Sequence, residues 1–263
     1  MLISYVFTAP KGLRLKDAWL MLCVSASLAV PPAALGSELA PGPLWVGRFD
    51  AGLAPWTEVL IKPELPRNTF NSRAWDGASA LEVKSKASMS LFARPLEVDL
   101  GSTPVLCWRW RVDGALRTAD MTRRSGDDYA ARLYVSLTLP DAEKSFALRT
   151  QLRLARALWG PQVPDAAINY VWDNRHAVGA EMPNAYTDRT RMVVLRSGSA
   201  DAGRWVWERR HVGQDASRLF SPRATAVQLA ITADTDNTGE EAHAGFADIH
   251  FVAADQPCQG NTQ

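Results

Sequence analysis

Apolar and polar residues alternate with a period of two along much of the chain. Residues 105–112, VLCWRWRV, place Trp108 and Trp110 on one face and Arg109 and Arg111 on the other. Three further segments share this alternation: 131–139, 226–234 and 244–251. Because successive side chains of a strand point to opposite faces, the pattern predicts strands with one buried face each.

Shorter apolar segments, separated by Gly, Pro, Asn and Asp, add further expected strands. They are residues 44–49, 80–85, 89–98, 168–172, 191–197 and 204–212. About ten short strands with turn residues between them are typical of a sandwich or barrel. The sequence therefore predicts an all-β protein built as an antiparallel β-sandwich, of jelly-roll, concanavalin-like or galactose-binding-like form.

One segment has helical spacing instead. In residues 143–160, Leu148, Leu152 and Ala155 form an apolar stripe, and arginines form a second stripe beside it. Gly160 and Pro161 follow and are typical of a helix end. One helix is therefore expected on a long connection between strands.

The N-terminus has the order of parts found in a Sec signal peptide. Lys11, Arg14 and Lys16 precede the apolar run 18–30, and small residues follow. The run is shorter than the roughly 20 residues that span a bilayer. We expect residues 1–36 to be removed after Gly36, although an uncleaved anchor is the alternative. Residues 37–263 then form a single domain of an exported protein, either periplasmic or secreted.

Charge excludes some partners of the exported part. Removing residues 1–36 takes away three of the 29 basic and one of the 28 acidic side chains, which leaves a net charge of −1. This balance gives no overall field for nucleic acid or for an anionic surface. We expect a monomer with no nucleic-acid partner and no stable membrane insertion after signal cleavage. Cys107 and Cys258 either form a disulfide or leave Cys107 as a small buried apolar residue.

An acidic loop lies between two apolar runs near the C-terminus. Asp234 and Asp236 offer oxygen ligands for calcium, but Thr238 and Gly245 stand at positions five and twelve of the loop, where an EF-hand needs an oxygen ligand and a bidentate Glu. A calcium site of another kind therefore remains open. The alternative is a turn in which Gly239 adopts a positive φ. Asp50 and Asp248 form a second candidate calcium pair, with a turn and an exposed strand position as their alternative.

Polar residues of several strands are candidates for a ligand-binding face. Arg109, Arg111, Arg132 and Tyr134 all point away from the predicted core. Guanidinium groups and a tyrosine edge suit the hydroxyls and carboxylates of a saccharide. A solvated arginine-rich surface is the alternative.

Residues 169–189 contain a loop with the composition of a binding site. Trp172, Asn174 and Tyr186 are its candidate ligand contacts, because an aromatic ring can stack on a sugar and an amide can bond its hydroxyls. Burial of the tryptophan is the alternative.

No phosphate-binding loop, dinucleotide fingerprint, nucleophile elbow or zinc spacing occurs in the sequence. No catalytic residue is assigned. A polysaccharide lyase or glycoside hydrolase is the first alternative, and it would require Tyr134, Arg132, His250 and Asp128 to converge. A structural domain that binds a protein partner is the second alternative.

Several motifs occur in a specific order: WRWRV, RRSGDDYAARLYV, NYVWDNRHAVGAEMPNAYTDRTRMVVLRSG and DTDNTGEEAHAGFADI. With this ordered set, from about Phe49 to Phe251, the chain resembles a bacterial exported family, domain of unknown function 3047. The resemblance implies a jelly-roll-like sandwich similar to carbohydrate-binding modules. It carries over no catalytic residues. The expected function is therefore non-catalytic binding of a saccharide or another cell-envelope ligand.

Overall fold

The computed structural model describes residues 42–160 and 163–260. The chain divides into two units, residues 1–39 and 40–263, and every described residue belongs to the second. The expected signal peptide and its cleavage after Gly36 lie outside the described residues. Among the described helices, none combines the length and apolar character needed to span a bilayer.

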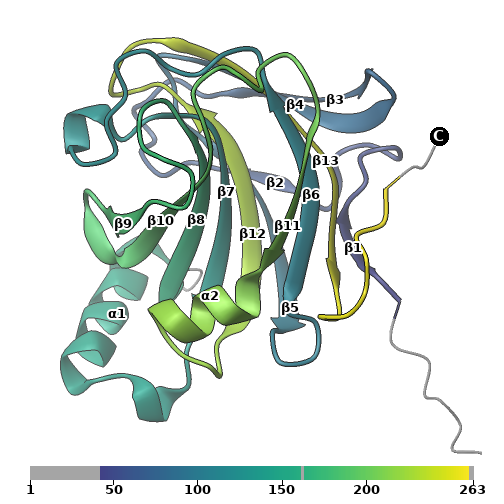
Figure 1. Ribbon diagram of the computed structural model, residues 1–263. Helices are drawn as coiled ribbons and strands as arrows, with labels where there is room; N and C mark the ends of the chain where they lie inside the picture. The colour runs from purple at the N-terminus through teal and green to yellow at the C-terminus, as the bar shows by residue number, and fades with distance from the viewer. Residues whose placement is uncertain (1–41, 161–162, 261–263) are drawn as a thin grey trace, which may run out of the picture. The chain divides into compact units, whose positions relative to one another are not determined.

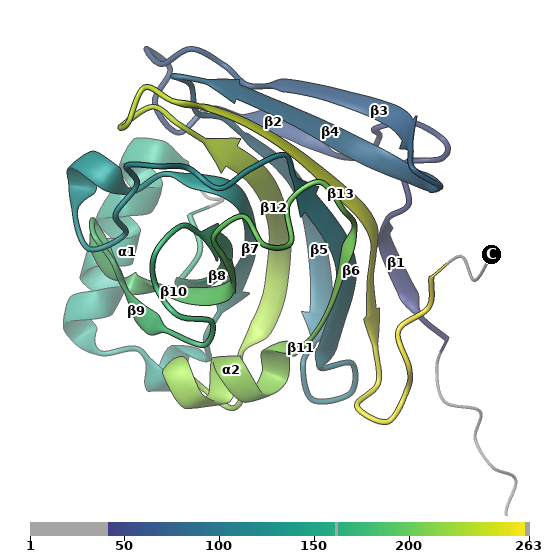
Figure 2. The ribbon, with the colours of Figure 1, turned by 45° about the horizontal axis from the view of Figure 1, so that its top comes forward.

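Two β-sheets form the described unit (Figures 1 and 2). The first, sheet A, has the order β11-β6-β13-β4-β3, with β1 also paired to β13. Its strands are β1 Leu44–Gly47, β3 Thr69–Trp75, β4 Ala78–Lys86, β6 Val105–Val112, β11 Val206–His211 and β13 Glu241–Val252. The second, sheet B, has the order β2-β5-β12-β7-β8-β10-β9. Its strands are β2 Thr57–Val59, β5 Leu91–Asp99, β7 Tyr129–Thr138, β8 Ala166–Asp173, β9 Glu181–Asn184, β10 Thr187–Ser197 and β12 Thr225–Asp234.

The predicted all-β sandwich is confirmed, with one exception to its antiparallel pairing. Strand β10 runs parallel to β8, whereas the other strand pairs are antiparallel in the part of the chain that the structure describes. The chain leaves β8, forms β9 at the sheet edge and turns back as β10 between the two. This return explains the parallel pair.

Large aromatic residues fill the core between the sheets. Trp108 and Trp110 of β6 face Tyr170 and Trp172 of β8, with ring centroids 5.7 Å apart for Trp108–Tyr170 and 5.6 Å for Trp110–Trp172. All four are at most 1% exposed. Replacing a core aromatic of this kind with alanine usually costs about 3–5 kcal/mol, so these residues specify how the two sheets pack.

The alternation of β13 changes at a bulge. Asp248 has a φ of 52°, and the register with β6 shifts between Ala247 and His250. As a result, Phe246 lies in the core together with Ile249 and Phe251. The sequence pattern wrongly assigned Phe246 to the polar face, because an uninterrupted period of two does not anticipate the extra residue.

The helix expected within residues 143–160 is confirmed as α1, Phe146–Trp159. The Ser145 side chain accepts a hydrogen bond from the Leu148 backbone N–H at its start, and Gly160 with φ 94° ends it. The expectation of a single helix is wrong. A second helix, α2, spans Val212–Leu219 and packs by its buried Val212, Asp215 and Ala216. Its eight residues are too few for a clear helical period beside the preceding strand.

The C-terminal segment is joined to sheet A by a disulfide between Cys107 and Cys258, whose Cα atoms lie 5.7 Å apart. The sequence left this pairing open. The bond closes a loop over a separation of 151 residues. In the chain-entropy account, a loop of this length stabilises the fold by up to about 5 kcal/mol.

Candidate functional site

A groove of about 340 Å³ lies on the face of sheet B that points away from the core. Strands β7 and β12 form its floor, and its sides are formed by the segment after β2, the start of β5, strands β9 and β10, and the turn after β12. Fourteen residues line it: Ile61, Lys62, Leu65, Met89, Leu91, Asp127, Arg132, Tyr134, Asn184, Tyr186, Thr190, Asp234, Asp236 and Asn237. The groove therefore combines apolar, aromatic and charged groups in one concave surface.

Alternation along β7 explains the floor. Leu133 and Val135 enter the core, so Arg132 and Tyr134 must point the other way. The guanidinium of Arg132 lies between two tyrosine rings, 4.4 Å from the centroid of Tyr129 and 4.9 Å from that of Tyr134. This stacking holds the arginine side chain in one orientation beneath the groove.

Two carboxylates share the Nη1 atom of Arg132. The atom donates a hydrogen bond to Asp234, and it lies 3.9 Å from Asp127 Oδ2. With its amide oxygen facing the guanidinium, Asn169 accepts hydrogen bonds of 2.8 and 3.2 Å from Nη2 and Nε. Burial by itself lowers the pKa of Arg132, but Asp234 together with Tyr134 and Asp127 outweighs that effect and the pKa is raised. Arg132 therefore stays charged.

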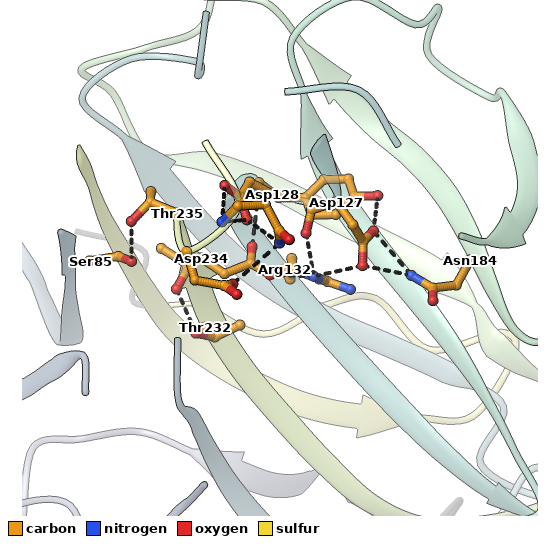
Figure 3. Close-up of polar contacts among 12 residues, drawn as sticks. Ser85, Asp127, Asp128, Arg132, Asn184, Thr232, Asp234 and Thr235 are labelled. Carbon is orange, nitrogen blue, oxygen red and sulfur yellow. Dashed lines mark hydrogen bonds and ion pairs between the residues drawn. The ribbon is translucent and has the colours of Figure 1, made fainter. Parts of the chain in front are cut away.

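Asp127 also receives hydrogen bonds from two other groups. The Tyr129 hydroxyl donates to its Oδ1 at 3.0 Å, and the Asn184 amide donates to Oδ1 and Oδ2 at 3.0 and 2.9 Å (Figure 3). Asn184 belongs to β9 and therefore connects the edge of sheet B to the floor of the groove. Asn184 Nδ2 also contacts Met192 Sδ at 3.7 Å, and the backbone N–H of Tyr186 donates to the Asn184 side-chain oxygen.

Three carboxylates meet where the loop after β12 crosses the start of β7. One oxygen each of Asp128, Asp234 and Asp236 lie within 4.8 Å of one another. Burial raises the pKa of Asp234 well above its ordinary value, and Asp128 adds to that rise. Burial and the nearby Asp128 likewise raise the pKa of Asp236, against the opposing effect of Lys62.

These three carboxylates are the residues that could hold a cation, and they include the predicted Asp234 and Asp236. Most of their oxygens already accept hydrogen bonds. Asp128 accepts from the backbone N–H groups of Asn237 at 3.1 Å and Thr238 at 2.7 Å. Asp234 accepts from the Tyr129 N–H at 2.9 Å and from Arg132. The loop is thus tied down as a turn, which favours the alternative to a calcium site.

Asp50 and Asp248, the other candidate calcium pair, each lie beside a different arginine. The carboxylate of Asp50 lies 3.3 Å from Arg48 and is half exposed. Asp248 lies at the bulge of β13, and its Oδ2 is 2.5 Å from Arg109 Nε. Neither residue belongs to a cluster of three or more metal-ligand side chains within the described residues. Their geometry therefore gives no support to a shared metal site.

The predicted ligand face does not exist as one surface. Arg109 and Arg111 lie on β6 of sheet A, whereas Arg132 and Tyr134 lie on β7 of sheet B. Arg109 is held between Trp205 and Trp207, with its Cζ 5.5 and 5.4 Å from their ring centroids. Alternation predicted correctly that all four point away from the core. It could not tell which sheet each strand would join.

The three candidate ligand contacts of the loop 169–189 also lie in different places. Tyr186 lines the groove and is 45% exposed, as a ligand contact requires. Trp172 is 1% exposed in the core, so the expectation that it contacts a ligand is wrong. Asn174 donates to the backbone oxygen of Ala119 at 2.9 Å and is not part of the groove lining.

The enzyme alternative required Tyr134, Arg132, His250 and Asp128 to converge. The structure contradicts this for His250. His250 stacks on Trp45, with centroids 4.5 Å apart, on the outer face of sheet A. Tyr134 and Arg132 face outward from sheet B. Because packed sheets lie about 10 Å apart, the two outer faces are separated by more than that distance. His250 therefore cannot share a site with them.

Several groove residues escaped the sequence reasoning. Ile61, Lys62 and Leu65 lie in a turn-rich segment after β2 whose local pattern carries no periodic signal. Asp127 lies just before β7 and was not among the ligand contacts predicted from the sequence. These residues meet although they are far apart in sequence, because β12 and β7 are neighbours in sheet B and β2 lies two places beyond β12 in the same sheet.

The fold and the groove define an all-β sandwich with one polar and aromatic concavity on an outer sheet face. Residues 54–250 match the model of a family described as "Protein of unknown function (DUF3047)". The chain belongs to this family, as the ordered motifs indicated. A comparison with curated proteins finds no match.

A comparison with solved structures finds weak similarity to proteins that include the following two. One is a thermostable cellulase derived from the Cel12A cellulase of Rhodothermus marinus, with 8% identity, a TM-score of 0.36, and coverage of 75% of this chain and 95% of that one. The other is the xyloglucanase domain of NopAA from Sinorhizobium fredii in complex with cellobiose, with 9% identity, a TM-score of 0.33, and coverage of 77% and 99%. Values this low carry no information about activity.

Proposed function

We propose that the groove of sheet B binds a saccharide without chemical conversion. The observation that carries the proposal is the lining itself, in which exposed Tyr186 and Ile61 stand beside polar Asn184 and Asp236. An aromatic or apolar surface suits the C–H face of a sugar ring, and carboxylates and amides suit its hydroxyls. The Arg132 network beneath holds these groups in place before a ligand arrives.

Calorimetric titration with soluble oligosaccharides from envelope and plant polysaccharides tests the proposal. Tyr186→Ala should weaken binding of a positive ligand at least tenfold. The matched control is Trp207→Ala, because Trp207 is 41% exposed and lies on the other sheet. Absence of binding by every oligosaccharide, or equal affinity of wild type and Tyr186→Ala, would overturn the proposal.

Glycoside hydrolysis is the second candidate, and one observation favours it. Asp236 has a raised pKa, as a proton donor requires, and it lines the same groove as Asp127. Release of reducing ends from a bound oligosaccharide, lost in both Asp236→Asn and Asp127→Asn, would establish this activity. Binding without any release would leave the non-catalytic function.

We further propose that the chain is exported and acts as a monomer in the periplasm or outside the cell. The Cys107–Cys258 disulfide supports an oxidising compartment. Cell fractionation with N-terminal sequencing should find the exported chain beginning at Ser37. Retention in the cytoplasm with the first 36 residues intact would contradict it. Light scattering should give the mass of one chain.

A further inference from the structure

Helix α1 has an unusual amount of exposed apolar surface. Only Leu152 is buried among the residues whose side chains are described, and Leu148 and Ala155 are partly buried beside it. Phe146 is 79% exposed and Leu154 is 63% exposed. These two residues are eight positions apart, so with 3.6 residues per turn they lie on one outward face, about 12 Å apart along the helix. Figure 1 shows α1 at the lower left, below strands β9 and β10 of sheet B.

A stripe of arginines runs beside that outward face. Arg149, Arg153 and Arg156 recur at helical spacing, and α1 contains no acidic residue. Together with Lys144 they line a cavity of about 340 Å³ in which Asp141 is the one acidic side chain. The helix therefore presents apolar groups and cationic groups side by side.

The positive charges of two of these arginines are not balanced by a nearby carboxylate of the described part of the chain. Asp165 pairs with Lys144 at 2.6 Å and with Arg156 at 2.8 Å. Within the described residues, Arg149 and Arg153 have no carboxylate within ion-pair distance. Both are exposed. Their charge is available to an external anion.

We propose that α1 docks the protein on the surface of an anionic phospholipid bilayer. Phe146 and Leu154 enter the boundary between headgroups and acyl chains, while Arg149 and Arg153 contact lipid phosphates. An apolar helix face flanked by arginines fits this interface. A stable protein interface would instead bury about 20–30 residues on each side, and two protruding apolar side chains are far fewer. The contact is peripheral and involves no spanning segment.

Sedimentation with vesicles tests the proposal on the full chain. Vesicles of phosphatidylglycerol and phosphatidylethanolamine in a 3:7 ratio are compared with pure phosphatidylcholine. Residues 1–41 are common to every variant, so differences between variants report on α1. Arg149→Gln/Arg153→Gln should lower partitioning onto the anionic vesicles about 10- to 30-fold, since each cation near an anionic surface contributes about a factor of five. Phe146→Ser/Leu154→Ser should lower it about tenfold.

The matched control is Arg67→Gln/Arg204→Gln, which removes the same charge at two exposed sites away from α1. It should change partitioning less than twofold. Equal losses in the control and in Arg149→Gln/Arg153→Gln would overturn the proposal, because the attraction would then be general. Titration with inorganic phosphate tests whether the arginines bind a free anion instead of a membrane surface. Tight phosphate binding without vesicle binding would assign the cavity to a free anion and would also overturn it.

Discussion

Arg132 and Asp234 form an ion pair in which both residues are almost entirely buried, at 3% and 1% exposure. The pair joins adjacent strands β7 and β12 beneath the groove. Burying two charges is costly. Their mutual attraction offsets that cost, together with the hydrogen bond that the Tyr129 N–H donates to Asp234 and those that Arg132 donates to Asn169. The groove therefore has a floor whose polar groups are fixed by one another.

Removing the cation should destabilise the protein more than removing this one anion. In Arg132→Met, Asp234 loses its ion-pair partner while Asp127 and Asp128 stay close, and the free energy of unfolding should fall by about 3–5 kcal/mol. In Asp234→Asn, Arg132 keeps Asp127 at 3.9 Å, so the loss should be smaller. Urea unfolding of both variants measures the difference. Equal losses would contradict the role given to Asp127.

Sequence alone predicted the strands that carry this floor. The alternation in residues 131–139 placed Arg132 and Tyr134 opposite the apolar residues, because strand faces depend only on neighbouring positions. It could not reveal that Asp127 and Asp234 would meet at Arg132, since that contact depends on the pairing of β7 with β12. For Trp172, the prediction from the local sequence is wrong because that sequence does not show how the two sheets pack. Its polar neighbours suggested a ligand contact, and only the packing against Trp110 places it in the core.

The stability of the protein should fall in acid through Glu82 of sheet A. Burial by itself raises the pKa of Glu82, but bonds from Arg73 and His243 outweigh it and lower the pKa from 4.5 to about 2. A carboxyl with a depressed pKa in the folded state stabilises the protein above pH 4.5, and this contribution is lost as the pH falls toward 2. Glu82→Gln should therefore cost about 1 kcal/mol at pH 7 after allowance for solvent screening.

Unfolding of wild type and Glu82→Gln at pH 7, 4 and 2.5 measures this effect. The difference between the two proteins should shrink steadily as the pH falls, since the wild-type carboxyl then becomes protonated. Glu97→Gln is a control because Glu97 is an exposed residue of β5 that takes part in none of the ion pairs described within residues 42–160 and 163–260. A constant difference across the range would contradict the assignment.

Loss of the disulfide should lower the thermal stability substantially. Cys107→Ala/Cys258→Ala releases the only described cross-link of the C-terminal segment to β6, and the expected cost is about 2–5 kcal/mol. Thermal unfolding of the wild type in dithiothreitol should approach that of the double variant. If reduction leaves the melting temperature unchanged while the thiols become reactive, the cross-link contributes nothing and the prediction fails.

The acidic loop after β12 should keep its structure without calcium. Asp128 already accepts bonds from the N–H groups of Asn237 and Thr238, and Gly239 has the positive φ of a turn. Addition of 2 mM EDTA, followed by excess calcium, should therefore move the melting temperature by less than about 1 °C, because a ligand stabilises a fold only by binding the native state more tightly. Asp128→Ala should lower the melting temperature equally with and without calcium, since it removes bonds within the turn. A rise with calcium in the wild type that disappears in Asp236→Asn would instead establish a metal site at Asp128, Asp234 and Asp236.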